Sequence, residues 1–226
     1  VATALMASAA LMGMELVVSQ RLQLVVGLSP LQAGLTILPI PLGAFIAGPL
    51  AGLALPRLGA ERILSASLGL AAAGALLYLL GYSAAYWIQL VSFALLGFGV
   101  GAAMTAASSA MLLHAPPDRA GMAASIEEVS YELGGAFGIA VLGSVMSAVY
   151  TSAFAAPASV DAPALAHDSL DGALIAAESL PDSVAAQLIG VAQSAFDSAF
   201  VTVMILVAAL LTMAALGIAL TTRRAR

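Results

Sequence analysis

Apolar residues run through this chain in long stretches, and most of the polar clusters fall between them. Six stretches are long enough for a membrane-spanning helix, which needs about 20 apolar residues. None shows the alternation over about ten residues that marks strands of a membrane barrel. Because backbone polar groups must be paired inside lipid, we expect the stretches to be helices. They cover Val1–Val26, Leu31–Leu55, Ile63–Leu80, Ala85–Leu113, Ala120–Val149 and Phe200–Leu220. The pattern predicts an all-α integral membrane protein, a bundle of six transmembrane helices.

Composition supports a membrane protein. Of the 226 residues, 62% are apolar and 8% are charged, whereas a soluble domain has about 25% charged residues. There is no cysteine, which excludes disulfides and thiol catalysis. The chain begins at Val1, inside an apolar stretch and without an initiator methionine or a signal sequence. We therefore expect an N-terminal portion of a longer protein to precede it.

The placement of charge predicts how the helices are oriented. All seven basic residues are arginines, and six of them flank connections that share one side if six helices alternate in direction. Basic residues favour the cytoplasmic side, so we expect this side and both ends of the chain to be cytoplasmic. The six are Arg57, Arg62, Arg119, Arg223, Arg224 and Arg226.

The opposite side carries a long acidic segment, 151–199. Its apolar periodicity predicts a helix over Ser169–Leu180 and another from Asp182 to the membrane, with Asp168 and Asp182 as N-caps. We expect a helical hairpin on the outer, periplasmic or extracellular, surface. The segment has no basic residue, and its acids are Asp161, Asp168, Asp171, Glu178, Asp182 and Asp197.

Three glutamates, Glu127, Glu128 and Glu132, interrupt the fifth apolar stretch. A carboxylate at membrane depth costs about 2.5–3.5 kcal/mol, so it usually faces water or a partner and marks an ion or substrate path. Glu128 and Glu132 are one turn apart on one helix face. Counted from Arg119 at about 1.5 Å per residue, both lie near the middle of the membrane core. The pair is a candidate to exchange a proton for a cationic solute; the alternative is a structural hydrogen bond between helices.

Other polar residues are candidates for the same site. Glu127 points about 100° away from Glu128, so pairing at a helix interface is an equal alternative for it. Glu15, near the middle of the first stretch, should lie at a depth similar to that of the Glu128/Glu132 pair. Tyr131 and Gln20 are candidates to line a cavity, although Gln20 could instead satisfy Arg21. Because Arg21 and Glu15 fall on different helix faces, Arg21 should meet another helix or the outer interface.

Small residues and prolines predict where helices pack closely or bend. Gly134 and Gly138 are four residues apart, a spacing that lets membrane helices approach closely. The run Gly97–Gly101 in the fourth stretch predicts the same. Gly52, Arg57 and Gly59 belong to a turn that is either solvated or a conformational latch. The second stretch contains prolines that should make its helix bendable, as in the interrupted helices of transporters: Pro39, Pro41 and Pro49.

No enzyme motif is complete. His114 and His167 fall at opposite membrane faces and cannot share a metal site, and Gly143-Ser144 has no histidine at its depth to act as a base. A Walker A sequence is absent, so energy must come from an ion gradient or a partner. The sequence predicts neither an enzyme nor a metal site.

Several motifs together resemble the C-terminal half of a major facilitator superfamily transporter, with two inverted three-helix repeats. More narrowly, the chain is similar to the fourteen-helix drug:proton antiporters that export quaternary ammonium compounds and methyl viologen. The motifs are Ser29–Leu35, Leu38-Pro39, the Gly52–Arg62 loop, Ile126–Gly134 and the long outer segment. Leu42–Phe45 and Gly135–Phe137 are faint echoes of the internal repeat.

The resemblance implies roles for individual residues. Acids at the positions of Glu128 and Glu132 serve proton coupling and cation recognition in that family, and Glu15 matches an acid of the methyl-viologen-type members. Pro56 occupies the usual acidic position of the family's loop motif, so a latch there would lack that charge. Ala44 stands where some relatives carry an acid, which implies a narrower range of dications.

The expected function is therefore proton-coupled efflux of lipophilic cations by alternating access. The expected partners are a missing N-terminal half, lipophilic cations, protons and the lipid bilayer, with no nucleic acid and no cofactor beyond the proton gradient. The expected location is a bacterial inner membrane. One alternative keeps the fold but exports a non-drug metabolite, and another is a non-transporting membrane scaffold subunit.

Overall fold

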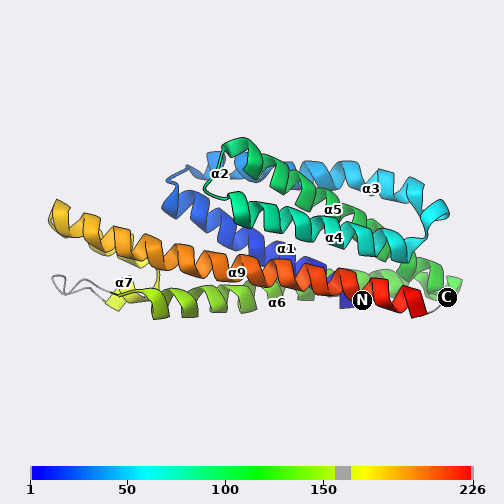
Figure 1. The fold of residues 1–226 in the computed structure, drawn as a ribbon. Coiled ribbons are helices and arrows are strands. Elements are labelled where there is room, and N and C mark those ends of the chain that lie inside the picture. Colours follow the sequence, from blue (N-terminus) through cyan, green and yellow to red (C-terminus); the bar gives the residue numbers. More distant parts are fainter. Residues whose placement is uncertain (1, 156–163, 225–226) are drawn as a thin grey trace.

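The computed structural model describes residues 2–155 and 164–224, and within these ranges every regular element is a helix (Figure 1). Asp161, one of the predicted outer acids, lies outside the described residues. In chain order the elements are α1 (Ala2–Gln20), the π-helical turn η1 (Arg21–Val25), α2 (Pro30–Ile37), α3 (Pro39–Leu58), α4 (Ala60–Gly81), α5 (Tyr86–His114), the 3₁₀ turn η2 (Pro117–Arg119), α6 (Ala120–Ala153), α7 (Ala164–Asp168), α8 (Leu170–Ala177) and α9 (Asp182–Arg224).

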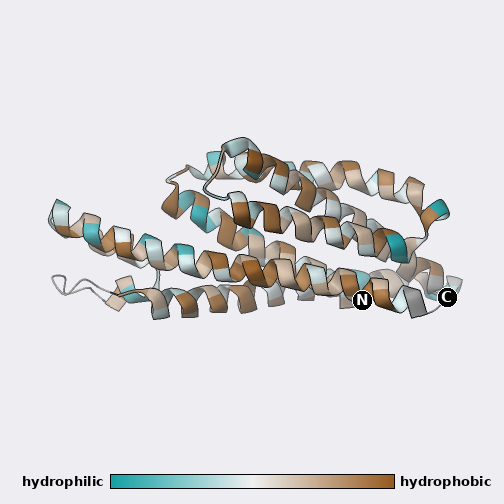
Figure 2. Ribbon diagram, in the orientation of Figure 1, coloured by the Kyte–Doolittle hydropathy of each residue, from teal (hydrophilic) through white to brown (hydrophobic). Residues whose placement is uncertain are grey.

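Six helical stretches in the described residues are long and apolar enough to cross a membrane, which confirms the predicted six-helix membrane fold. Hydrophobic residues run along these helices, and hydrophilic ones gather mainly toward the ends of the bundle (Figure 2). The stretches are Ala2–Val25, Pro30–Leu58, Ala60–Gly81, Tyr86–Leu113, Ala120–Ala153 and Asp182–Thr222.

The last membrane helix is longer than its apolar pattern suggests. α9 is continuous from Asp182 to Arg224, so the expected second arm of an outer hairpin is the beginning of the last membrane helix rather than a separate surface helix. α8 forms the other arm and packs on α9. Its N-cap is Ser169, whose Oγ accepts a hydrogen bond from the Gly172 amide at 3.0 Å, and not Asp168 as predicted. The predicted helix from Asp182 to the membrane is thus present, but it continues into the last span, and its amphipathic pattern between 182 and 199 made it resemble a separate surface helix.

The second membrane stretch is interrupted, in line with its prolines. Ser29 begins α2 with a reciprocal capping box, in which its Oγ accepts from the Gln32 amide and the Gln32 side chain accepts from the Ser29 amide. α2 ends at Ile37, and α3 begins at Pro39. Proline cannot donate a backbone hydrogen bond and crowds the preceding turn, so the boundary between α2 and α3 falls beside a proline. Leu38 at this boundary keeps helical dihedral angles and donates to the Gly34 carbonyl, so the two helices form one span.

The helices pair in a pattern that repeats when the six spans are divided into two groups of three. α1 packs along α6, as α5 packs along α3, and α4 packs against α9. The first span therefore packs on the fifth, and the fourth span, its counterpart in the other group of three, packs on the second. The third span packs on the sixth, which is its own counterpart. This exchange is what two inverted three-helix repeats produce. The two similar sequence segments, Leu42–Phe45 and Gly135–Phe137, also occupy corresponding places in the two repeats. Gly43 lies against α5, and Gly135 lies against α1.

Glycines of α5 make its close contacts possible. A Cβ added at Gly97 or Gly101 would fall within 3 Å of the α3 backbone, and one at Gly99 would collide with the backbone of α4. α5 therefore packs between α3 and α4 without intervening side chains, as the small residues of the Gly97–Gly101 run predict.

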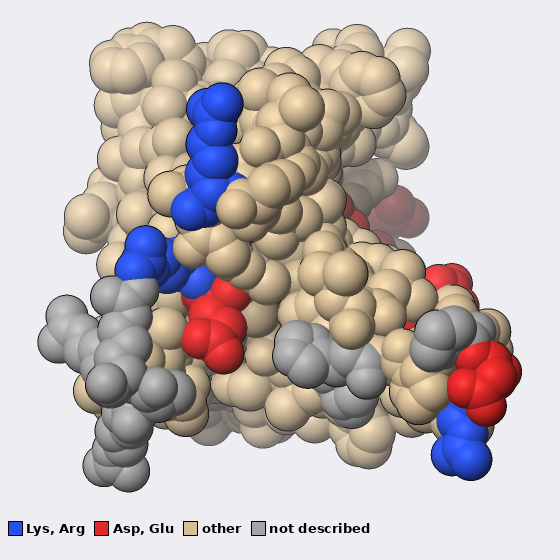
Figure 3. All heavy atoms as spheres, turned by 90° about the vertical axis from the view of Figure 1, so that its right-hand side faces the viewer, with Lys and Arg blue, Asp and Glu red and all other residues tan. Residues whose placement is uncertain are grey.

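The two ends of the bundle differ in charge. Both termini lie at the same end (Figure 1), together with the α3–α4 turn and η2; we call it the arginine-rich end, after Arg57, Arg62 and Arg119. Figure 3 looks onto this end and shows charged side chains scattered over an otherwise uncharged surface. At the opposite end lie α7, α8 and the start of α9 (Figure 1), and we call it the acidic end, after Asp168, Asp171 and Asp182.

Candidate functional site

The glutamates of α6 divide into two environments. Glu127 is partly buried, and its Oε2 accepts a hydrogen bond from Ser108 Oγ of α5 at 3.1 Å. Glu128 and Glu132 are exposed, and neither is ion-paired to a residue that the structure describes. In a membrane-spanning helix such carboxylates require a water-filled cavity or a covering partner.

Tyr131 holds α6 against two other helices. Its hydroxyl donates to the Met104 carbonyl of α5 at 3.4 Å, and its own carbonyl accepts from Ser8 Oγ of α1 at 2.7 Å. The Tyr131 side chain therefore contacts α5 and its backbone contacts α1, next to the glutamates on the same helix.

Glu15 lines a groove between α1, the α2–α3 break and α5. The groove has a volume of about 540 Å³, within the range of sites for drug-sized ligands, about 300–1,000 Å³. Glu15 is the single charged residue in its lining, which otherwise is mostly apolar. Ala44 lines the same groove. A cation with apolar substituents matches this combination of one carboxylate and apolar walls.

Glu15 does not lie at the depth of Glu128 and Glu132, contrary to expectation. α1 and α6 run in the same direction, with Leu5 against Gly134 and Leu16 against Gly143. By this register Glu15 lies roughly 15–18 Å further toward the acidic end than Glu132, at about 1.5 Å per residue. The carboxylates therefore occupy two levels of the bundle.

An open face of the bundle joins the two levels. Met12 is one turn before Glu15, and Gly135 is one turn after Glu132. The Met12 side chain lies over Gly135, and 43% of Met12 is exposed. The surface around Met12 is therefore uncovered in the described structure and lies between the two acids.

Gly134 and Gly138 form the close α1–α6 contact that their spacing predicts. A Cβ at Gly138 would meet the Ala9 backbone, with Ala9 Cα at 2.6 Å, and one at Gly134 would meet Leu5 Cα at 2.9 Å. These contacts fix the register of the two helices. Gly134 and Gly138 therefore allow α1 and α6 to approach closely, as their spacing in the sequence predicts.

The other three predicted packing residues lie at the end of α3, which contains Gly52 and Arg57, and in the turn to α4, which contains Gly59. Gly59 has φ of 79°, a conformation that favours glycine. Gly52 faces open space. Arg57 is exposed and forms no ion pair with the residues that the structure describes. The turn is structurally specific at Gly59, but the described contacts contain no latch at Arg57.

Arg21 lies near the acidic end and is buried. Its Nε is 3.2 Å from Asp197 Oδ1 of α9, which confirms that Arg21 meets another helix. The guanidinium carbon lies 4.5 Å from the ring centre of Tyr82 and 5.3 Å from that of Phe200. Arg21 begins the π-helical turn η1, a deviation common at functional positions.

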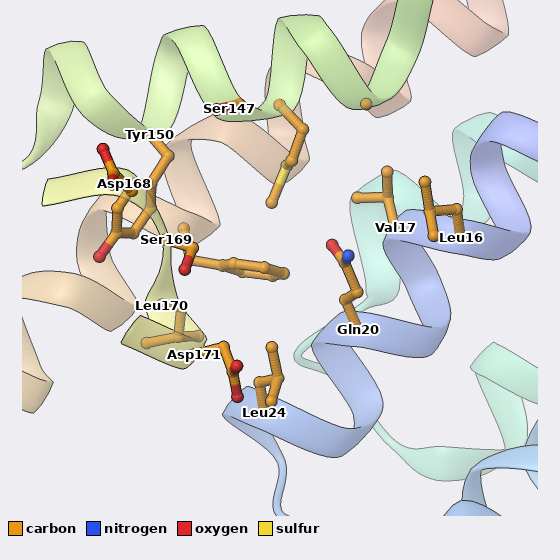
Figure 4. Close-up of a pocket in the computed structure, with 13 residues that line it drawn as sticks. Leu16, Val17, Gln20, Leu24, Ser147, Tyr150, Asp168, Ser169, Leu170 and Asp171 are labelled. Atoms are coloured by element: carbon orange, nitrogen blue, oxygen red, sulfur yellow. The ribbon is translucent and has the colours of Figure 1, made fainter. Parts of the chain in front are cut away.

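A second cavity, of about 180 Å³, lies at the acidic end. We call it the outer pocket; it is formed by α1, α6, the α7–α8 segment and α9 (Figure 4). Gln20, predicted to line a cavity, contributes to this pocket and not to the Glu15 groove. Within the described residues, no cluster of three or more histidine or acidic side chains could hold a metal ion.

Comparison with known proteins identifies the family. The sequence model of the Major Facilitator Superfamily matches residues 1–222. The chain belongs to the major facilitator superfamily. As a member of this superfamily of transporters, it is a multi-pass membrane protein with six apolar helices.

Several proteins that are similar in sequence to this chain are named as drug-resistance or drug-efflux proteins. The chain is 34% identical over 199 residues to the methyl viologen resistance protein SmvA of Salmonella typhimurium, covering 87% of this chain and 40% of that protein. It is 34% identical over 217 residues to the multidrug efflux pump LfrA of Mycolicibacterium smegmatis, covering 95% and 43%. The drug efflux pump JefA of Mycobacterium tuberculosis is 34% identical over 136 residues, covering 60% and 27%. The chain thus spans about two fifths of the length of the first two relatives, which agrees with the resemblance to one half of a transporter.

Sequence reasoning missed several contacts of the candidate residues. Ser108 and Met104 of α5, Ser8 of α1 and Asp197 of α9 contact Glu127, Tyr131 or Arg21. Serine and methionine are common in apolar helices, so their presence in the sequence does not predict these contacts. Asp197 could have been suspected, because it is an acid near the predicted start of the last span, on the same side as Arg21.

Proposed function

We propose that this chain is the C-terminal half of a proton-coupled efflux antiporter that exports lipophilic cations. The observation that carries the proposal is the open face around Met12, which has Glu15 in an apolar groove on one side and Glu132 on the other. The names of the relatives SmvA, LfrA and JefA support drug efflux. The remaining half of the protein would cover this face and enclose the cavity between them.

The proposed cycle uses the two carboxylate levels. With the cavity open to the arginine-rich end, taken as cytoplasmic, the ionised Glu128/Glu132 pair binds the cation. When the cavity opens to the acidic end, the cation passes the Glu15 groove and leaves as protons replace it on the carboxylates. A carboxylate cannot hold the proton and attract the cation equally well, so the two ligands compete for the same negative charge.

The deciding experiment uses acid-loaded inverted membrane vesicles that contain the complete transporter. A quaternary ammonium dye added outside should drive proton release in the wild type. The double variant Glu128→Gln/Glu132→Gln should abolish the release, whereas Glu178→Gln, an exposed acid outside the spans, should not. Release that survives in the double variant would contradict the assignment. A wild type inert to cations but active with another solute would favour export of a non-drug metabolite.

A scaffold role makes a different prediction. If the chain only assembled with partners through its outer segment, deletion of residues 161–178 would remove binding of partners and leave no transport to measure. Cation-driven proton release in the wild type excludes that role.

A further inference from the structure

The outer pocket is a built cavity, because hydrogen bonds and packing fix its outer wall. Tyr150 of α6 is buried and donates its hydroxyl hydrogen to the Ala166 carbonyl of α7 at 2.9 Å. Thr151 donates to the His167 carbonyl at 3.2 Å. Ala173 of α8 is fully buried. The wall made by α7 and α8 is therefore held against the membrane helices on both sides.

The chemistry of the lining favours an organic cation. Asp168 and Asp171 are exposed and place their carboxylates at the rim of the pocket, Gln20 contributes an amide, and the walls consist mainly of aliphatic side chains and the largely buried Phe196 ring. Figure 4 shows the Gln20 side chain reaching into the space between α1 and the α7–α8 segment, with Asp168 and Asp171 on the far side. An aromatic face and carboxylates together attract cations that also bear apolar groups.

No basic residue lines the pocket to neutralise these carboxylates. Arg21 is adjacent to Gln20 in sequence, but it is paired with Asp197 and stacked on Tyr82 and Phe200. The whole segment 151–199 contains no lysine or arginine. A concave surface of a single sign of charge raises the local concentration of oppositely charged solutes.

We propose that the outer pocket binds an amphipathic organic cation as it leaves the transporter, with the charged group beside Asp168 and Asp171 and an apolar part against the aliphatic walls. The proposal rests on the proposed function and adds to it a second site, at the acidic end. The pocket is distinct from the Glu15 groove, with which it shares no lining residue. At about 180 Å³ it is smaller than sites that enclose a drug-sized ligand, about 300–1,000 Å³. It therefore encloses only part of such a ligand.

Binding of ethidium to the purified complete transporter tests the proposal. The protein is placed in zwitterionic lipid nanodiscs, so that anionic lipid does not bind the dye, and carries Glu15→Gln, Glu128→Gln and Glu132→Gln to remove the central acids. Fluorescence titration should still detect a weak site. Adding Asp168→Asn and Asp171→Asn should weaken that site by about tenfold or more, since both carboxylates that attract the cation are lost.

The matched control adds Glu178→Gln and Asp182→Asn, which remove the same charge from the same segment outside the pocket lining. Equal affinity in the control and the pocket variant would overturn the proposal. Ser147→Arg provides a second test, because Ser147 is exposed and lines the pocket, so an arginine there should repel the dye. Unchanged binding in a Ser147→Arg protein that elutes as the wild type would also overturn it.

The outcomes separate this site from the proposed function. Loss of all binding with the three central variants, together with normal proton release in the wild type, would retain the antiporter and reject the outer pocket. Binding at the pocket without cation-driven proton release in the wild type would support a cation site and reject the antiporter.

Discussion

Arg21 and Asp197 are 176 residues apart in the chain and form an ion pair with Nε and Oδ1 separated by 3.2 Å. The Arg21 side chain is 8% exposed and that of Asp197 is 37% exposed. The pair joins the π-helical end of the first span to the extended last helix. It also keeps the only arginine near the acidic end, among the residues described there, away from the outer pocket, whose carboxylates stay uncompensated.

Asp197→Asn should destabilise the protein. The change leaves the buried Arg21 without its counter-charge, which costs about 3–5 kcal/mol in a fully buried pair. Because Asp197 is partly exposed, we expect a loss nearer to 1–3 kcal/mol and a lower Tm for the detergent-solubilised protein. The control is Asp182→Asn, which removes an exposed acid from the same helix that forms no ion pair with the residues the structure describes. An equal Tm for the two variants would show that the ion pair contributes nothing.

Gly138→Ala should force α1 and α6 apart. The added Cβ would collide with the Ala9 backbone, and overpacking of this kind costs about 1–3 kcal/mol. Gly217→Ala places the same methyl group in α9 with no atom within 4 Å and should be neutral or stabilising by up to about 1 kcal/mol, since glycine weakens a helix. Thermal unfolding compares the two. A Gly138→Ala protein as stable as the Gly217→Ala protein would contradict the observed α1–α6 contact.

Glu127→Gln should preserve transport. The amide oxygen of glutamine can still accept the hydrogen bond from Ser108 Oγ, so the contact between α5 and α6 survives. We expect cation-driven proton release within about twofold of the wild type. Glu127→Leu removes the acceptor and should lower the stability by about 0.5–1.5 kcal/mol. Loss of coupling in Glu127→Gln would instead place Glu127 with Glu128 and Glu132 in the proton pathway.

Glu15→Gln should weaken cation recognition. Glu15 supplies the single charge of an otherwise mostly apolar groove, so its removal should raise the dye concentration for half-maximal efflux by about tenfold, equivalent to about 1.4 kcal/mol. Ser19→Ala alters the same groove without changing its charge and should have little effect. Similar shifts in both variants would argue against an electrostatic role for Glu15.

Ala44→Asp should increase the preference for dications. Ala44 lines the Glu15 groove, so the substitution places a second carboxylate in the same cavity. Efflux of methyl viologen should rise relative to that of a monovalent quaternary ammonium dye, and Ala44→Asn should leave the ratio unchanged. Each intramembrane carboxylate costs about 2.5–3.5 kcal/mol on insertion, so the amount of variant protein in the membrane must be measured alongside. An unchanged ratio in a well-inserted Ala44→Asp protein would contradict the groove's assignment as a cation site.

The residues of the candidate site were largely visible in the sequence, but their grouping was not. Glu15, Glu128 and Glu132 stand out because acids are rare in apolar helices. The register of α1 on α6 separates them into two levels, and that register depends on the backbone contacts of Gly134 and Gly138. The Ser108 contact of Glu127 likewise depends on where α5 crosses α6.

The sequence by itself determined the six membrane helices, the break beside Pro39 and the close-packing glycines. Each follows from local properties: apolar length, a missing backbone donor or a missing side chain. Only the tertiary structure decided the depth of Glu15, the pairing of Arg21 with Asp197 and the unbroken passage of the helix that begins at Asp182 into the last span. Depth and pairing depend on how helices distant in sequence align, and α9 continues beyond its apolar part because one face of it packs on α8. Hydropathy counted along a single helix contains no information about either kind of contact.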